Sequence, residues 1–134
     1  MKNINEAMKN LKDIRIIEDS EIIMEMANLT SRRTGLPAVT IWSDQSGINR
    51  NKPDNDARVK ITGPDYEVSV SIEKKPRILA RTKNIKQSEM NNIKAAMEYI
   101  GRNYDLFLKH YESSEDIYDD DDLKNDLRKR GDYK

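Results

Sequence analysis

The spacing of hydrophobic residues changes along this chain, and that change constrains the fold more than any other feature. In residues 66–72 every second side chain is apolar, which is typical of a strand with one face on a core. From Met90 to Tyr111 apolar residues recur at every third or fourth position, which predicts a long amphipathic helix. Strands followed by such a helix predict an α+β domain.

Alternating segments on either side of 66–72 predict the rest of the sheet. Segments 38–42 and 57–61 also alternate, and TGPD at 62–65 predicts a tight turn. A further short strand through Ile78 and Ala80 must lie at an edge, because the proline before it cannot donate to a ladder. Residues 44–56 are rich in Asn, Asp, Gly, Ser and Pro, and we expect a contact loop there.

Shorter helices are predicted at both ends of the chain. An amphipathic pattern predicts one helix over about 4–13. Over about 20–29 the spacing of Ile, Met and Leu favours a second helix, although the β-branched residues there favour a strand. Ser88 is the expected cap of the long helix, and a last helix over about 121–129 would bury its two leucines.

The length of 134 residues is that of one domain. We therefore predict a single α+β domain in which an antiparallel meander of three or four strands packs on the long helix. Its parts are an N-terminal helical extension (1–29), the sheet (37–81), the long helix (88–111), and an acidic arm with the short C-terminal helix (112–134).

The composition indicates the cellular compartment in which the protein is expected to work. The chain has no cysteine, which excludes disulfides, zinc–thiolate sites and cysteine catalysis and fits a reducing compartment. No apolar run reaches the length of a signal-peptide core or of a membrane span. We expect a soluble cytoplasmic protein without a membrane partner, and the oligomeric state stays open.

A net charge of zero conceals a strong polarity along the chain. Residues 30–86 hold twelve basic and six acidic side chains, whereas residues 105–127 hold two basic and nine acidic ones. A basic middle is therefore followed by an acidic arm. Such asymmetry can steer charged partners even when the total charge vanishes.

The acidic arm contains four consecutive aspartates, which are open to three interpretations. They could cap the last helix and lie against its dipole, but a cap needs about two of the four. They could bind a metal, but successive helical side chains point about 100° apart and the pattern is not that of a calcium loop. They could imitate phosphates in front of a basic protein surface. The candidate partner-binding residues are Glu112, Glu115, Asp116, Asp119, Asp120, Asp121 and Asp122.

The basic middle supports an alternative, a nucleic-acid interface on the sheet face and its loops. Against it, Trp42 and Tyr66 are the aromatic residues of this region and both are expected in the core, so platforms for base stacking are missing. The candidate residues for this alternative are Arg32, Arg33, Arg50, Lys52, Arg58, Lys60, Lys74, Lys75 and Arg77.

Catalytic patterns are missing from the sequence. His110 is the single histidine, and we expect it at the surface or boundary of the long helix rather than in a Ser–His–Asp set. Five scattered glycines form neither a phosphate-binding loop nor a dinucleotide fingerprint. We expect no enzyme activity, no cofactor and no metal.

The middle of the chain resembles a known family. ANLTSRRTGLP, VTIWSD, a variable loop, ARVKI and a long C-terminal helix form a TGLP…IW…ARVK signature over about residues 27–129. It is similar to that of small uncharacterised bacterial and phage-borne proteins. The resemblance implies a compact α+β domain, often carried on mobile elements, and brings no agreed activity.

These observations together predict a non-catalytic accessory protein. We expect it to bind a host protein with a basic surface, such as a nucleic-acid-binding or defence protein, and to inhibit it through the acidic arm. Binding of nucleic acid by the basic middle is the alternative.

Overall fold

The computed structural model describes residues 26–45 and 57–134. The helix predicted over 4–13 lies outside the described residues. So does most of the predicted contact loop, including Arg50 and Lys52.

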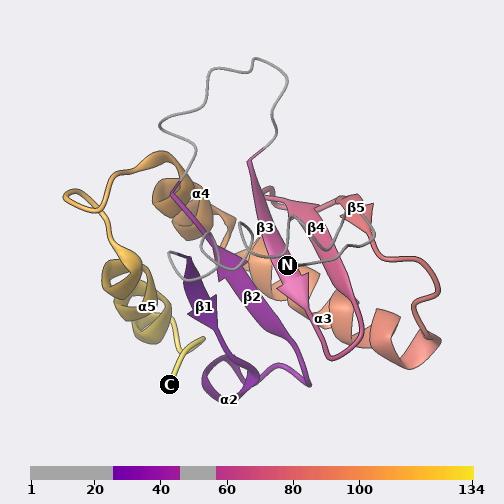
Figure 1. Ribbon diagram of the computed structural model, residues 1–134. Helices are drawn as coiled ribbons and strands as arrows, with labels where there is room; N and C mark the ends of the chain where they lie inside the picture. Colours follow the sequence, from indigo (N-terminus) through magenta and orange to yellow (C-terminus); the bar gives the residue numbers. More distant parts are fainter. Residues whose placement is uncertain (1–25, 46–56) are drawn as a thin grey trace, which may run out of the picture.

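The described strands form one antiparallel meander in which each strand pairs with the next along the chain (Figure 1). This confirms the predicted α+β class, with five strands in place of three or four. The strands are β1 (Ala27–Leu29), β2 (Thr40–Ser43), β3 (Arg58–Thr62), β4 (Glu67–Ser71) and β5 (Ile78–Arg81).

The extra strand is β1, where the sequence favoured a helix. That prediction was wrong for Ala27–Leu29. Ala27 and Leu29 are buried while Asn28 is exposed, which is the alternation of a strand, and β2 supplies the pairing partner. A strand of three residues is too short for its period to be distinguished from a helical one in the sequence.

Register places two different rows of side chains on the two faces of the sheet. On the inner face Leu29, Ile41, Ile61 and Val68 lie opposite one another across four strands, and all four are fully buried. The outer row is more polar and less buried, and no described helix covers it. It consists of Asn28, Trp42, Lys60, Ser69 and Ala80.

Helices α3 (Gln87–Arg102) and α4 (Tyr104–Glu112) cover the inner face (Figure 1). The sequence predicted one continuous helix here, capped by Ser88. The helix instead begins at Gln87, where the Glu89 carboxylate accepts the Lys86 N–H, and it is interrupted at Asn103. None of the described helices is long and apolar enough to cross a bilayer.

Asn103 explains the interruption, because its buried amide binds both the last turn of α3 and groups beyond the helix. Its Nδ2 donates to Tyr99 O at 3.1 Å and to Asp132 Oδ2 at 2.8 Å. Its Oδ1 accepts from Arg130 Nη1 at 3.2 Å. A side chain that bonds backbone and distant groups in this way competes with regular helix.

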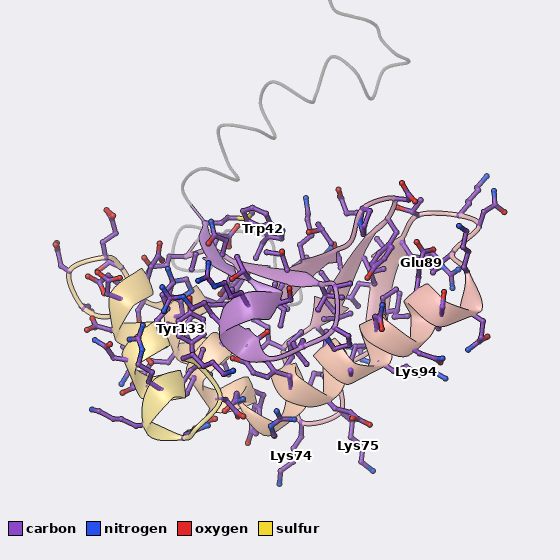
Figure 2. The ribbon with its side chains drawn as sticks, turned by 90° about the horizontal axis from the view of Figure 1, so that it is seen from below. Trp42, Lys74, Lys75, Glu89, Lys94 and Tyr133 are labelled. Carbon is purple, nitrogen blue, oxygen red and sulfur yellow. The ribbon has the colours of Figure 1, made fainter. Side chains whose placement is uncertain are left out.

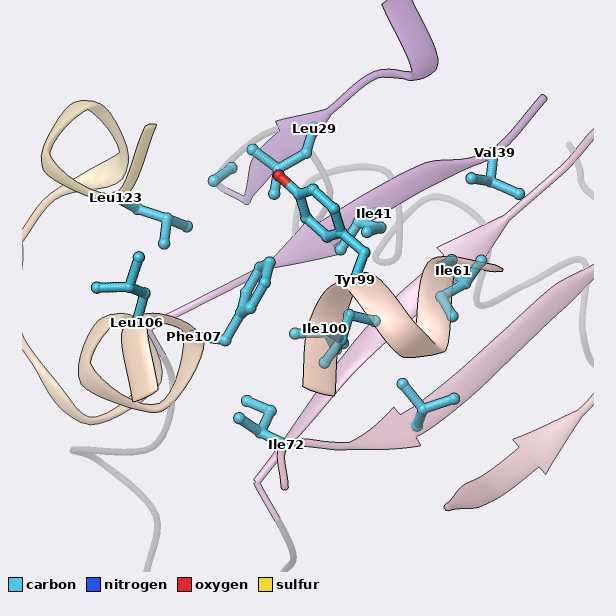
Figure 3. Close-up of a cluster of buried hydrophobic side chains, with 14 of the residues drawn as sticks. Leu29, Val39, Ile41, Ile61, Ile72, Tyr99, Ile100, Leu106, Phe107 and Leu123 are labelled. Atoms are coloured by element: carbon cyan, nitrogen blue, oxygen red, sulfur yellow. The ribbon is translucent and has the colours of Figure 1, made fainter. Parts of the chain in front are cut away.

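The core lies between the sheet and the two helices (Figure 3). Tyr99 and Phe107 fill its centre edge to face, with ring centroids 6.3 Å apart. Gly101 lets α3 approach the β4–β5 turn, since a Cβ there would lie 2.5 Å from the Lys74 carbonyl oxygen.

A short helix, α2 (Ser31–Thr34), follows β1, and the C-terminal helix α5 (Asp120–Lys129) lies beside β1 (Figures 1 and 3). Leu123 and Leu127 of α5 are fully buried, as predicted. Gly131 has a φ of 82°, a left-handed conformation suited to glycine, and turns the chain away from the helix. Backbone bonds then join Lys134 N–H to Arg33 O at 2.9 Å.

Ion pairs hold α5 against the break between α3 and α4. Arg130 binds Asp105 through both terminal nitrogens, at 2.9 and 2.6 Å, and these bonds lower the pKa of Asp105. Burial would raise the pKa of Asp132, but bonds from Arg102 and Asn103 outweigh it and lower the pKa below its ordinary range. The C-terminal segment is therefore attached by paired charges as well as by its leucines.

Candidate functional site

The acidic arm forms the connection from α4 to α5, and residues 112–122 contain seven acidic and no basic side chains. The structure divides these seven residues into two sets. Asp119, Asp120 and Asp122 make bonds within the molecule. The other four are exposed: Glu112, Glu115, Asp116 and Asp121.

Asp119 is the N-cap of α5. Its Oδ1 accepts the Asp122 N–H at 2.8 Å, and Asp122 Oδ2 accepts the Asp119 N–H at 3.0 Å. This reciprocal pair is a capping box, in which two backbone donors that the helix leaves open are satisfied. The predicted capping role is thus confirmed, although the helix begins one residue earlier than expected.

Asp120 binds His110, which is fully buried on α4. His110 Nε2 lies 2.8 Å from Asp120 Oδ1, and Nδ1 lies 2.8 Å from Ser43 Oγ on β2. Because a carboxylate can only accept, Nε2 donates to Asp120, and in a neutral ring Nδ1 accepts from Ser43. The imidazole therefore connects β2, α4 and α5.

The prediction of a surface position for His110 was wrong. His110 follows Phe107 by three residues, so it lies on the same buried stripe of the helix. A serine, a histidine and an aspartate are brought together, but the Ser43 side chain has no exposed surface through which a substrate could reach it. The arrangement as it stands is a structural connection.

Ile117 is an apolar residue that lies between the four exposed carboxylates in the sequence. It is 70% exposed, while Ile78, the other exposed large hydrophobic side chain of the described residues, is 36% exposed. Glu115 and Asp116 precede Ile117 in the same turn, and no ion pair of the described residues involves either of them or Glu112 or Asp121. We call Ile117 and these four carboxylates the acidic surface.

The turn that carries Ile117 is fixed from beneath. Ile117 and Tyr118 both donate to Ser114 O at 3.0 Å, which closes the turn. Tyr118 is buried and its hydroxyl donates to Asp126 Oδ2 at 2.7 Å, while Gln45 Nε2 donates to the carbonyls of Ser113 and Tyr118. Because these bonds fix the backbone of the turn, its main chain loses little conformational freedom when a partner binds.

Metal binding finds no support in the geometry. Two of the four consecutive aspartates bind each other's backbone and a third binds His110, so they point in different directions. Within residues 26–45 and 57–134 no group of three His, Asp or Glu side chains could hold a metal ion.

The basic candidates do not gather on one surface. Arg58 and Lys60 lie on the outer face of the sheet, and Lys60 pairs with Glu67 at 3.2 Å. Lys74 and Lys75 project from the opposite side of the molecule, beneath α3 (Figure 2). Arg77 pairs with Glu73 at 2.6 Å, whereas Arg32 and Arg33 lie on α2, where Arg33 Nη1 donates to Lys134 O at 2.9 Å.

Of the two aromatic residues of this region, only Tyr66 is buried in the core. Trp42 is half-buried on the outer face, where its Nε1 donates to Thr62 Oγ1 at 2.8 Å (Figure 2). The outer face thus offers one indole beside Lys60.

Comparisons with known proteins add nothing to these observations. No family model, curated protein or solved structure matches the chain. The resemblance of residues 27–129 to a phage-borne family stays a prediction.

Proposed function

We propose that this is a non-catalytic protein-binding accessory protein that docks on a basic surface of a partner through the acidic surface. The exposed Ile117 carries the proposal, because an apolar side chain on a bonded turn, with carboxylates before and after it in the sequence, has the composition of an interface anchor within a polar rim. The carboxylates in the same connection define what kind of partner fits.

The two kinds of side chain have separate tasks. Full burial of one isoleucine in a pocket of the partner contributes about 1.5–3 kcal/mol. The four carboxylates lie at the rim of the proposed interface, where they keep most of their hydration. They contribute mainly to the rate and specificity of association with a basic surface. This division, an apolar anchor within a polar rim, is the common anatomy of protein interfaces.

Inhibition would follow from the same contacts. A basic groove that binds phosphates is blocked when carboxylates occupy it, so a nucleic-acid-binding partner loses its ligand. A host defence protein as the partner rests on the resemblance to phage-borne proteins, and the docking proposal does not depend on it.

The alternative, nucleic-acid binding by the basic middle, has less support. Lys60, Arg77 and Arg33 already bind groups of the same molecule, and Lys74 and Lys75 lie on the other side from Arg58 and Lys60. The indole of Trp42 is the one observation in its favour.

A pulldown from the source cell, with and without nuclease treatment, tests the proposal. We expect the full chain to capture a protein of basic surface in both conditions, and Ile117→Ser to capture at least tenfold less, as loss of about 1.4 kcal/mol requires. The matched control is Ile78→Ser, which changes an exposed isoleucine of β5, outside the acidic surface, and should capture the same basic protein as before.

Charge is tested by a variant that leaves the capping box and His110 intact. Glu112→Gln, Glu115→Gln, Asp116→Asn and Asp121→Asn together should slow association and weaken its dependence on salt, with little change in melting temperature. Capture that disappears after nuclease treatment would favour the nucleic-acid alternative. Capture that survives both the isoleucine and the charge variants would contradict the proposal.

A further inference from the structure

β5 leaves one edge of the sheet open. It is the final strand in the order, and no described strand lies beyond it. Ile78, Ala80 and Arg81 are exposed, and Leu79 is half-buried. An edge strand with these properties presents backbone donors and acceptors with which another chain can pair.

The direction of the backbone at this edge follows from one bond. Thr82 N–H donates to Glu67 O at 3.0 Å, so Thr82 faces β4. Neighbouring residues of an antiparallel strand face opposite sides, and Arg81 therefore directs its N–H and C=O away from β4. Arg81 is a position at which a further strand can join the ladder.

Charge indicates what kind of strand fits. Segment 74–86, which contains β5 and its flanks, carries six basic and no acidic side chains. Glu73, just before it, neutralises Arg77. Two copies of this chain paired through β5 would place two basic segments side by side, and like charges across a ladder are destabilising. A strand that carries carboxylates fits this edge instead.

We propose that the β5 edge binds an extended acidic segment of a partner protein by strand addition. Main-chain bonds to β5 provide affinity, and side chains on alternate positions of the segment meet the lysines and arginines. This surface is separate from the acidic surface and attracts partners of the opposite charge, so the proposal stands whether or not Ile117 docks on a partner.

Selection of a random peptide library on the immobilised full chain tests the proposal. Enriched peptides should alternate acidic with β-branched residues. A selected peptide should bind Arg81→Pro about fivefold to tenfold more weakly than Arg81→Ala, the loss of one hydrogen bond. Both variants lack the guanidinium, so the comparison isolates the backbone N–H, and proline is tolerated in edge strands.

A second measurement leaves the protein unchanged in case Arg81→Pro disturbs the fold. N-methylation of alternate amides of the selected peptide keeps its charge but removes ladder donors, and it should weaken binding by a similar factor when the methylated amides face β5. Methylation of the other alternate set is the control and should leave binding unchanged.

Three outcomes would overturn the proposal. Enriched peptides with no excess of acidic residues would remove the argument from charge. Equal binding by Arg81→Ala and Arg81→Pro, together with indifference to N-methylation, would leave electrostatic attraction without strand addition. Self-association of the full chain that Arg81→Pro abolishes would make a second copy the occupant.

Discussion

The two edges of the sheet differ in how they are completed. At β1 the side chains of Ala27 and Leu29 are buried, and α5 lies alongside with Leu123 pointing into the same core (Figure 3). At β5 the side chains are largely exposed and β4 is the only described strand beside it. The C-terminal helix lies beside one edge, which we call the closed edge, and no described strand lies beyond the other, which we call the open edge.

Polar groups follow the same division. Beside the closed edge, His110 and Asn103 are buried and bonded on both sides to segments distant in the sequence. Around β5 the basic side chains lie on an exposed segment. The difference teaches that buried polar groups near β1 maintain the fold, while the basic side chains around β5 and the carboxylates around Ile117 face solvent.

The largest effect on stability is expected from a variant that weakens the packing at the closed edge. Leu123→Ala removes a fully buried side chain and should lower the free energy of unfolding by about 2–5 kcal/mol. Leu79→Ala, which truncates the half-buried side chain of the largely exposed β5, is the matched control and should cost less than about 1.5 kcal/mol. Urea denaturation of the two variants measures both. Equal losses would mean that the two edges contribute alike.

A smaller effect concerns the ion pairs that attach α5. Asp132→Asn removes the charge that binds Arg102 and Asn103 and should lower the free energy of unfolding by about 1.5–3 kcal/mol at neutral pH. The pKa of Asp132 and that of Asp105 are both lowered in the fold from an ordinary 3.8. Their stabilisation is therefore complete above about pH 4 and is lost as pH falls through the lowered pKa values.

Denaturant titrations from pH 7 to acid check that expectation. The curve of Asp132→Asn should be flatter below about pH 4 than that of the unmodified chain. Glu73→Gln serves as the comparison at the open edge, where hydrogen bonds from Ser71 and then Arg77 also lower the pKa of Glu73. Since the Glu73 side chain is more exposed than that of Asp132, 41% against 19%, its change should be smaller and should shrink in salt.

The smallest effect separates the two sets of carboxylates within the acidic arm. Asp119→Ala removes the cap of α5 and should cost about 0.5–2 kcal/mol. Asp121→Ala, in the same turn but in the acidic surface, should change the free energy of unfolding by less than about 0.5 kcal/mol. Thermal melts of the two variants measure both changes. A larger loss of stability for Asp121→Ala than for Asp119→Ala would contradict the division of the carboxylates into a capping set and an exposed set.

Long alternating segments of the sequence predicted their structure well, because their pattern repeats often enough to define a period. Tyr66, Val68, Val70 and Ile72 were expected inward and are all buried. The period failed at β1, which is short, and at Asn103, which ends α3 through bonds to residues thirty or so positions away. Interactions of that kind leave no local pattern.

The candidate site was predicted in part. The capping role of Asp119 follows from a local rule, since aspartate before a helix accepts its first free N–H groups. The burial of His110 could have been predicted, because His110 shares a helical stripe with Phe107, but its bond to Asp120 of another helix leaves no such pattern. The exposure of Ile117 could not have been predicted from the sequence. Whether Ile117 or Tyr118 points outward is determined by the hydrogen bonds of the turn and of the Tyr118 hydroxyl.

The bond between Lys134 N–H and Arg33 O has a consequence for the order of folding. These residues are 101 positions apart in the chain, and bringing them together costs about 4 kcal/mol of loop-closure entropy unless intervening segments have already folded. During synthesis the β2–β5 hairpins and α3 can assemble while β1 still has an uncovered side. Until α5 has emerged and packed beside β1, the nascent chain exposes two strand edges, and that interval is when it is most prone to aggregate.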